Sequence, residues 1–285
     1  MCSLIEIHVY LFVCPLCRFS PLHIYIRATV CLARQVLITF CLYGLNQGGV
    51  HAFNELGRVY SYKDRGYEPA ETQRAIAYTD MSWNLKPLFA LCFDALPLFG
   101  YHFKSYLLFW GLLGSTAYGL IAAIPKALSD AVFTFLLWAG MNSVVWNDIA
   151  IDGMTVQKMK RHKHVDTELQ SFQVFTGIVV SIFTSFSSGF IIDAIGLQWL
   201  YAIVCLIAVI ATIACLLMDE KRDLTARLSF VSFWRDLKNA FSAFRDKVYL
   251  NIFLYTAIVS FSFQLSGVMI YWYENTTIRY THSHS

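Results

Sequence analysis

The sequence predicts an all-α fold, a polytopic bundle of membrane-spanning helices. Three observations predict it: 57% of the 285 residues are hydrophobic, only 14% are charged, and the apolar residues gather in long, repeated runs. A bilayer needs about 20 apolar residues per helix, and soluble domains carry about 25% charged residues. The net charge of +3 is too small to indicate nucleic-acid binding, so the lipid bilayer is the expected environment.

The apolar runs predict six spanning helices within residues 30–218. Their expected limits are 30–56, 72–93, 104–124, 129–156, 169–192 and 197–218. Small residues recur at every fourth position of the third helix and of the fifth, which predicts close contacts with other helices (Gly111, Ser115 and Gly119; Gly177, Ser181, Ser185 and Gly189). The polar residues 57–71 are interpreted as a short exposed loop between the first two spans.

The segments outside this bundle are shorter or more polar. Residues 1–29 form a poorly defined N-terminal segment that matches a signal peptide badly. Residues 219–247 carry aromatic and basic residues at helical spacing, which predicts an amphipathic linker on an anionic, cytoplasmic membrane face. A seventh span and a short outer tail are expected in 248–285. This layout is that of the first half of a protein built from two six-helix halves, so the chain looks truncated.

The orientation follows from the basic residues. With the N-terminus in the cytoplasm, most lysines and arginines fall in the inner segments, as the positive-inside rule expects. The sequon Asn275-Thr276-Thr277 would then lie outside, where it can be glycosylated. We expect an integral, multi-pass protein of the plasma membrane, with an organelle membrane as the alternative.

The sequence gives no sign of enzyme, metal or cofactor chemistry. Cys14 and Cys17 form a C-x-x-C pair, but no second pair completes a zinc site. Most of the other cysteines lie in apolar runs, where cysteine behaves as a small hydrophobic residue. A Gly-rich phosphate loop and a nucleophile elbow are also missing from the sequence, so we expect neither an enzyme nor a bound cofactor.

Lys86 is the first candidate functional residue. It lies inside an apolar run, in the stretch Trp83-Asn84-Leu85-Lys86-Pro87-Leu88. A charge there is costly in lipid, so Lys86 is expected to face protein or a water-filled cavity. Two hypotheses stay open: Lys86 binds a substrate carboxylate, or it is paired internally with Asp80 or with an aspartate of the helix over 129–156.

Two neighbours of Lys86 carry their own expectations. Pro87 removes a backbone donor, which predicts a break in the helix beside a cavity. Trp83 lies three residues before Lys86, on about the same helix face. It either stacks on an aromatic ligand or packs within the bundle.

Asp148 and Asp152 lie four residues apart, so both project from one face of the fourth helix. Two carboxylates on one buried face repel each other, which favours binding of a proton and suits a proton carrier. Alternatively, they latch the inner end of the bundle by pairing with Lys104 or Lys158. We favour the latch for Asp152 and leave Asp148 open.

These motifs together resemble the folate–biopterin transporter family of the major facilitator superfamily. The resemblance covers roughly residues 35–220 and rests on Trp83–Leu88, Asp94–Tyr101, Asn147–Asp152 and Leu169-Gln170-Ser171. It implies the N-terminal six-helix half of a major facilitator-type fold plus a seventh span. It also implies secondary transport of a folate- or pterin-like anion, by symport with protons.

The resemblance implies a set of site residues. Lys86 would meet the substrate carboxylate, Trp83 its ring and Asp148 the coupling proton, with further site residues at Asp152, Asn147 and Gln170. Asp94, Gly100 and Lys104 would belong to a cytoplasmic gating loop. Two alternatives stay open: transport of another small solute, such as a sugar or amino acid, and a non-transporting membrane protein that binds a full-length partner.

Overall fold

The computed structural model describes residues 36–95, 98–125, 127–161 and 166–218, with short pieces between residues 220 and 258. In this part of the chain the regular structure is helical, and one isolated bridge between Leu98 and Tyr101 is the only strand-like pairing. The predicted all-α fold is therefore confirmed.

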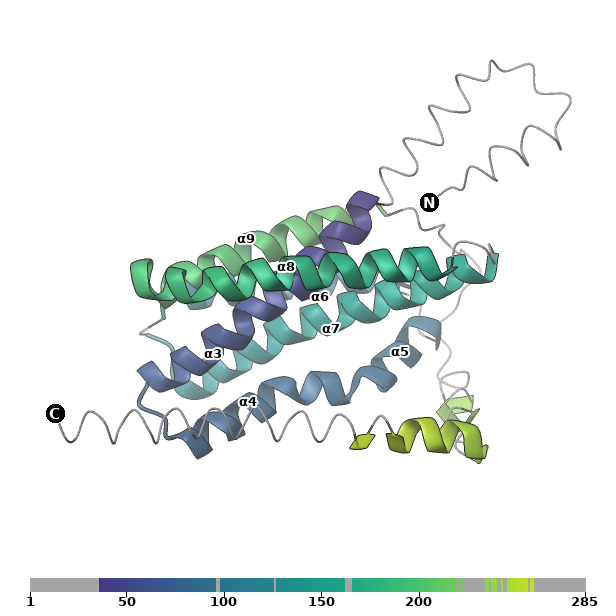
Figure 1. Cartoon of the computed structure of the whole chain (residues 1–285), viewed down its shortest axis with the longest axis horizontal. Coiled ribbons are helices and arrows are strands. Elements are labelled where there is room, and N and C mark those ends of the chain that lie inside the picture. Colours follow the sequence, from purple (N-terminus) through teal and green to yellow (C-terminus); the bar gives the residue numbers. More distant parts are fainter. Residues whose placement is uncertain are drawn as a thin grey trace, which may run out of the picture.

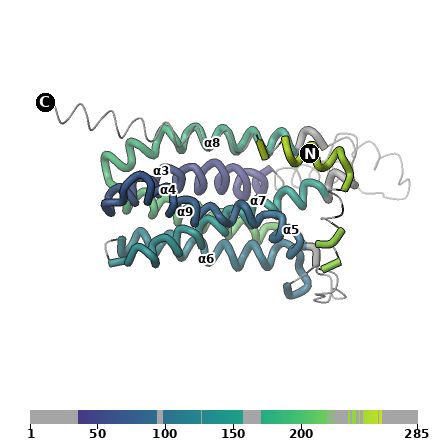
Figure 2. The backbone as a smooth tube through the Cα atoms, turned by 90° about the horizontal axis from the view of Figure 1, so that it is seen from below, coloured from purple at the N-terminus to yellow at the C-terminus, as the bar shows by residue number. Residues whose placement is uncertain are grey.

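The helices follow one another with short connections. Residues 36–39 are helical and lead into η1, a π-helix. The elements are η1 (Phe40–His51), α3 (Ala52–Asp64), α4 (Pro69–Asn84), α5 (Lys86–Ala95), α6 (Lys104–Ala123), α7 (Asp130–Arg161), α8 (Asp166–Ile195) and α9 (Leu197–Leu216). The long helices lie side by side, with the α3–α4 and α8–α9 turns at one end and the start of α6 at the other (Figures 1 and 2).

The predicted loop over 57–71 is wrong. Helix α3 continues to Asp64, and Arg58 and Tyr62 within it are buried. These polar groups face other helices: Arg58 pairs with Asp80 of α4, and the Tyr62 hydroxyl lies 2.9 Å from Thr134 Oγ1 of α7. The turn is confined to residues 65–68, and a capping box starts α4.

The remaining predicted spans correspond to observed helices. Those over 104–124 and 197–218 match α6 and α9, and α7 and α8 extend beyond the predicted limits. Within the described residues, three segments are long and apolar enough to cross a bilayer: Lys104–Ala123, Gln170–Ile195 and Leu197–Leu216. Helix α8 exposes a row of phenylalanines, which fits contact with lipid tails (Phe175, Phe183, Phe186 and Phe190).

Small residues let the helices approach closely. A Cβ atom on Gly111 of α6 would lie 2.4 Å from Thr212 Oγ1 of α9, and one on Gly48 of η1 would lie 2.5 Å from the carbonyl oxygen of Gly177 in α8. Neither position has room for a side chain. The close contacts expected of the third helix and of Gly177 are confirmed, whereas a Cβ on Gly189 would meet nothing within 4 Å.

Trp146 of α7 joins α5 and α6 to the bundle. Its ring stacks on Phe89 at 4.8 Å, on Tyr106 at 5.0 Å and on Trp110 at 5.6 Å between ring centroids, and it meets Phe93 edge-on at 5.0 Å. Aromatic pairs at these distances stabilise by about 0.5–1.5 kcal/mol each beyond their buried area. The cluster fixes α5 against α6 and α7, just after the break between α4 and α5.

The predicted outer segments stay predictions. Residues 1–29 and the tail with its sequon lie outside the described residues, as does most of the linker over 219–247. The described part of the seventh span is helical over 247–255.

Candidate functional site

The second spanning segment is interrupted where Pro87 predicts a break. Helix α4 ends at Asn84, Leu85 lies between the two helices, and α5 begins at Lys86. Proline is tolerated in the first turn of a helix because the N–H that it lacks has no partner there in any case. The break therefore places Lys86 at the start of a new helix.

Lys86 is paired with the aspartates of α7. Its Nζ donates a hydrogen bond to Asp148 Oδ2 and lies 3.7 Å from Asp152 Oδ2. The exposed side-chain fraction is 5% for Asp148, 32% for Lys86 and 52% for Asp152. We call these three residues the lysine centre; with all groups ionised, its net charge is −1. Of the two internal partners proposed for Lys86, the α7 aspartate is present and Asp80 is not.

Gln173 of α8 completes the surroundings of Asp152. Its Nε2 donates to Asp152 Oδ1 at 2.9 Å, and its Oε1 accepts from Thr155 Oγ1 at 3.1 Å. Gln173 is buried, whereas Gln170, the predicted glutamine, is exposed near the start of α8. Gln170 and Gln173 are three residues apart, so they lie on nearby parts of one helix face. The sequence pattern does not specify how α8 is rotated about its axis, and so it does not show which of the two glutamines meets Asp152.

The proposed latch between Asp152 and Lys104 is wrong. Lys104 Nζ donates instead to the carbonyl oxygens of Leu216 and Met218 at the end of α9, at 3.0 and 3.3 Å. A cation near a helix C-terminus is stabilised by the helix dipole and the unpaired carbonyls there. The side chain of Lys158, the other proposed partner, lies outside the described residues.

Trp83 lies beside Lys86, as their spacing predicts. Lys86 Nζ is 5.4 Å from the centroid of the Trp83 ring, a cation–π distance. The indole Nε1 donates to Met141 Sδ at 3.3 Å, and the ring of His51 meets Trp83 nearly at right angles with centroids 5.4 Å apart. Trp83 thus contacts a charged residue on its own segment and a titratable residue at the end of η1.

Asn147, a predicted site residue, forms its hydrogen bond away from the lysine centre. It is buried, and its Nδ2 donates to the carbonyl oxygen of Ser143 in its own helix at 2.8 Å. Asp148, the next residue, supplies the carboxylate to the lysine centre. The Asn147 side chain thus makes this contact within α7, and Asn147 does not line the cavity beside Lys86.

A cavity of about 610 Å³ adjoins the lysine centre. It is lined by Trp83, Lys86, Pro87, Ala90, Phe93, Phe103, Ile149, Asp152, Gly153 and Val156. Its wall combines an ammonium, a carboxylate and aromatic rings on an otherwise apolar surface. Such a wall suits an aromatic molecule that carries both hydrogen-bonding groups and a negative charge.

A second group of charges lies between α3 and α4, and we call it the arginine centre: Arg58, Glu55 and Asp80. Arg58 donates to both carboxylates, and its Nη1 also donates to Thr79 Oγ1 at 2.9 Å. The Arg58 side chain is 4% exposed, against 50% for Glu55 and 31% for Asp80. The sequence pattern does not indicate this centre, because Arg58 stands in the polar stretch predicted to be a loop.

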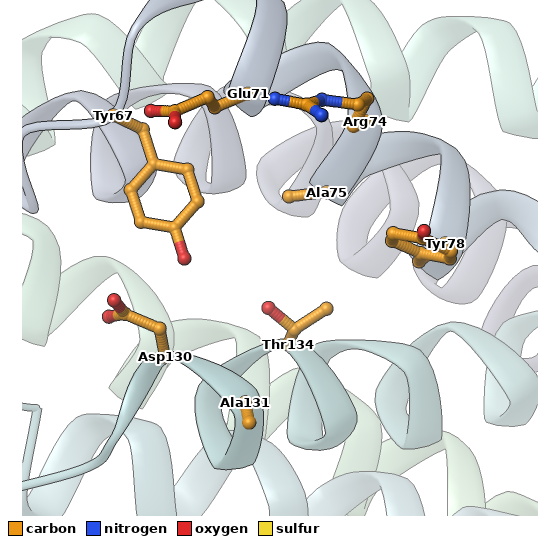
Figure 3. A pocket seen from close by; sticks show the side chains of 8 residues that line it. All are labelled: Tyr67, Glu71, Arg74, Ala75, Tyr78, Asp130, Ala131 and Thr134. Carbon is orange, nitrogen blue, oxygen red and sulfur yellow. The ribbon is translucent and has the colours of Figure 1, made fainter.

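A second cavity of about 650 Å³ lies between α4 and α7 near the α3–α4 turn (Figure 3). The Tyr67 hydroxyl points toward the Asp130 carboxylate, and Glu71 and Arg74 lie at the rim. Burial, followed by the negative charge of Asp130, raises the pKa of Tyr67 above its ordinary value. Asp130 itself pairs with Arg65 at 2.7 Å. The charged side chains that line this cavity are exposed, so the cavity is a weaker candidate for a binding site than the one beside Lys86.

The predicted gating loop is a tight turn held by Glu220, which follows the end of α9. Phe99 and Gly100 adopt positive φ angles of 57° and 80°. The carboxylate of Glu220 accepts the backbone N–H groups of His102, Phe103 and Lys104, which cap the start of α6. The Asp94 side chain lies outside the described residues, so its expected role in the loop is untested. Among the described residues, no group of three His, Cys, Asp or Glu side chains could hold a metal ion.

Comparisons with known proteins agree on one group. A family model described as the BT1 family matches residues 47–277. The chain is 27% identical over 165 residues to "Probable folate-biopterin transporter 2" of Arabidopsis thaliana, which covers 57% of this chain and 32% of that protein. It is 28% identical over 207 residues to "Folate-biopterin transporter" of Synechocystis, a match that covers 70% of this chain and 41% of that protein. It is 23% identical over 222 residues to "Folate transporter 2" of Plasmodium falciparum, a match that covers 76% of this chain and 47% of that protein. The chain thus spans less than half the length of these relatives, and no solved structure matches it.

Proposed function

We propose, from the premise that this chain belongs to the BT1 family, that it carries the site at which a membrane transporter binds folate- or pterin-like organic anions. The family match confirms the resemblance predicted from the motifs, and the relatives' names supply the substrate class. The observation that carries the proposal is the cavity beside the lysine centre, where a cation and an indole ring share one wall.

The substrate would divide its contacts between two residues. A folate carboxylate binds the Lys86 ammonium, and the pteridine ring stacks on Trp83. Lys86 is 32% exposed, so an incoming carboxylate can reach it without unfolding the bundle. The second aspartate partner, at 3.7 Å, is too distant for a close hydrogen bond, which leaves Lys86 with capacity for a ligand.

The charge of the lysine centre gives a reason for proton coupling. Two carboxylates and one ammonium already sum to −1, so an added anion is repelled unless a positive charge comes with it. A proton on Asp148 or Asp152 brings the centre to zero. Symport of one proton with each substrate carboxylate would therefore keep the charge of the occupied site equal to that of the empty site.

The experiment measures binding and uptake with the same chain. The purified 285-residue chain in lipid nanodiscs is titrated with folate and with biopterin, and binding is followed by quenching of tryptophan fluorescence. Uptake of labelled folate is measured in bacteria that lack their own folate uptake. We expect both substrates to bind, and Lys86→Ala to weaken folate binding at least about tenfold, which corresponds to about 1.4 kcal/mol.

Lys63→Ala is the matched control, because Lys63 is an exposed lysine at the end of α3. It should bind folate like the parent chain. If Lys86→Ala also binds folate like the parent, the proposed site is wrong. If a panel of sugars and amino acids binds while folate and biopterin do not, the alternative substrate class replaces the proposed one.

A further inference from the structure

The cavity beside the lysine centre continues well beyond Lys86. Its lining residues on the second spanning segment fall three or four positions apart, at Trp83, Lys86, Ala90 and Phe93. At 1.5 Å per residue, Lys86 and Phe93 lie about 10 Å apart along α5. The cavity therefore has a charged end, with Lys86 and Asp152, and a second end about two helical turns away.

Two phenylalanines form this second end, and we call it the phenylalanine end: Phe93 of α5 and Phe103, which precedes α6. Both side chains are buried, and their ring centroids are 5.1 Å apart. Phe93 also meets Trp146 edge-on at 5.0 Å, and the backbone N–H of Phe103 donates to the Glu220 carboxylate at 3.0 Å. Neighbouring groups therefore fix both residues, and the wall that they present to the cavity suits an aromatic ring.

Gly153 of α7 sets the room at the phenylalanine end. It lines the cavity next to Asp152, and a Cβ atom on it would lie 2.9 Å from Phe103 Cε1 and 3.1 Å from Phe103 Cζ. The first distance is closer than real side chains allow, so any side chain at position 153 would displace the Phe103 ring. Because that ring packs against Phe93 and its backbone is capped, we expect the displacement to take space from the cavity.

Folate and biopterin differ in a ring that this end has room to hold. Folate carries a p-aminobenzoyl ring between its pteridine and its glutamate, and biopterin lacks this ring. In the proposed function the glutamate carboxylate binds Lys86 and the pteridine stacks on Trp83, two groups that are 5.4 Å apart. The ring that joins them must then bend away from the charged end, and the cavity extends from there toward the phenylalanine end.

We propose that the phenylalanine end binds the p-aminobenzoyl ring of folate, and that Gly153 makes the site selective for pteridines that carry such a ring. The proposal rests on the proposed function, since it names the preferred substrate of the same site. A ring–ring contact of this kind strengthens binding by about two- to tenfold. We therefore expect the parent chain to bind folate more tightly than biopterin.

Gly153→Val tests the width of the phenylalanine end. The purified chain in lipid nanodiscs is titrated with folate and with biopterin, and p-aminobenzoylglutamate, which lacks the pteridine, competes with labelled folate. We expect Gly153→Val to weaken folate binding at least about tenfold, because the added side chain overpacks this end, and to change biopterin binding by less than about threefold. p-Aminobenzoylglutamate should compete in the parent chain and not in the variant.

Phe103→Leu is the second variant, and it tests the aromatic contact rather than the width. It keeps an apolar side chain but removes the ring, so folate binding should weaken by about two- to tenfold while biopterin binding stays as in the parent. The same loss should appear in a chain that already carries Lys86→Ala, because the two contacts lie at opposite ends of the cavity and their free energies add. If Gly153→Val binds neither ligand, Phe103→Leu alone decides the question.

Gly189→Val is the matched control. It makes the same substitution in α8, where a Cβ atom on Gly189 would meet nothing within 4 Å. It should bind folate and biopterin like the parent chain.

The outcomes separate this inference from the proposed function. A parent chain that binds neither pteridine overturns both. A parent chain that binds biopterin at least as tightly as folate overturns the inference and leaves the proposed function in place. A Phe103→Leu variant that weakens both ligands by the same factor, or neither of them, has the same consequence, since Phe103 would then only pack α6 against its neighbours.

Discussion

The arginine centre and the lysine centre hold the same set of charges but bury different members of it. Each holds one cation and two carboxylates. In the arginine centre the cation is buried, at 4% exposure, and both carboxylates reach the surface. In the lysine centre a carboxylate is buried, at 5%, and the cation is 32% exposed. A buried guanidinium is fixed by its partners, whereas a partly exposed ammonium can exchange one carboxylate for another.

The comparison suggests that one centre stabilises the fold and that the other is suited to binding. Arg58 forms a fork with Asp80 and ties α3 to α4, so the arginine centre serves the fold. Lys86 meets its partners beside a cavity, which fits the binding role proposed for the lysine centre. The experiments below would break this distinction or make it sharper.

Removing Asp80 should have the largest effect on stability. Asp80→Ala leaves the buried guanidinium of Arg58 with Glu55 as its remaining carboxylate, and loss of a partner from a buried ion pair costs about 3 kcal/mol or more. Unfolding of the chain in mixed micelles by denaturant measures the change. Asp64→Ala, at an exposed aspartate ending α3, should stay within about 0.5 kcal/mol of the parent. Equal effects of the two substitutions would mean that the arginine centre does not hold the fold.

Removing the ammonium of the lysine centre should lower the stability less than Asp80→Ala does, but it should weaken folate binding more. Lys86→Met leaves the buried Asp148 without its ammonium, and we expect a loss of about 2 kcal/mol. Asp148→Asn added to it should recover about 1 kcal/mol or more, because the unpaired charge disappears. Folate binding should stay lost in the double variant. Recovery of binding together with stability would show that Lys86 does not meet the substrate.

Exchanging the two cation types tests geometry at constant charge. Arg58→Lys loses the fork to Asp80 and the bond to Thr79, which should cost about 1–2 kcal/mol. Lys86→Arg, at a partly exposed site that uses a point charge, should change the free energy of unfolding by less than about 1 kcal/mol. The same denaturant titration ranks them. The opposite ranking would remove the distinction between a fixed and an exchangeable cation.

A smaller effect than at Arg58 is expected at Gln173. Gln173→Leu removes the hydrogen bond to Asp152 Oδ1, but Asp152 is half exposed, so water replaces the donor. We expect a cost of about 1 kcal/mol in stability and a change in folate affinity of less than tenfold. Gln170→Leu, at the exposed glutamine, should change both quantities less. If Gln170→Leu has the larger effect on affinity, the motif position rather than the observed contact marks the site.

Local patterns predicted the lysine centre better than the arginine centre. An isolated lysine in an apolar run needs a partner, and two aspartates four residues apart supply one face of carboxylates, so the Lys86–Asp148 pair follows from spacing and burial cost. The break at Leu85 follows in the same way from Pro87. Both inferences use residues that are close in sequence or unusual for their surroundings.

The features that were missed depend on distant or rotational information. Arg58 stands in a polar stretch that looks like a loop, and its burial depends on Asp80, 22 residues later. Gln173 rather than Gln170 meets Asp152 because of the rotation of α8, which the sequence pattern does not specify. His51 meets Trp83 at the end of a π-helix, and a shift from α- to π-geometry has no simple sequence signal.

The cap on α6 has a consequence for the order of synthesis. The backbone N–H of Lys104 is bound by Glu220, which follows 116 residues later in the chain. At about 5–20 residues per second, the ribosome needs on the order of ten seconds to add that stretch. During this interval α6 enters the membrane with its first N–H groups open to water or lipid headgroups. The cap on the start of α6 can therefore form only after Glu220, which follows α9, has been made.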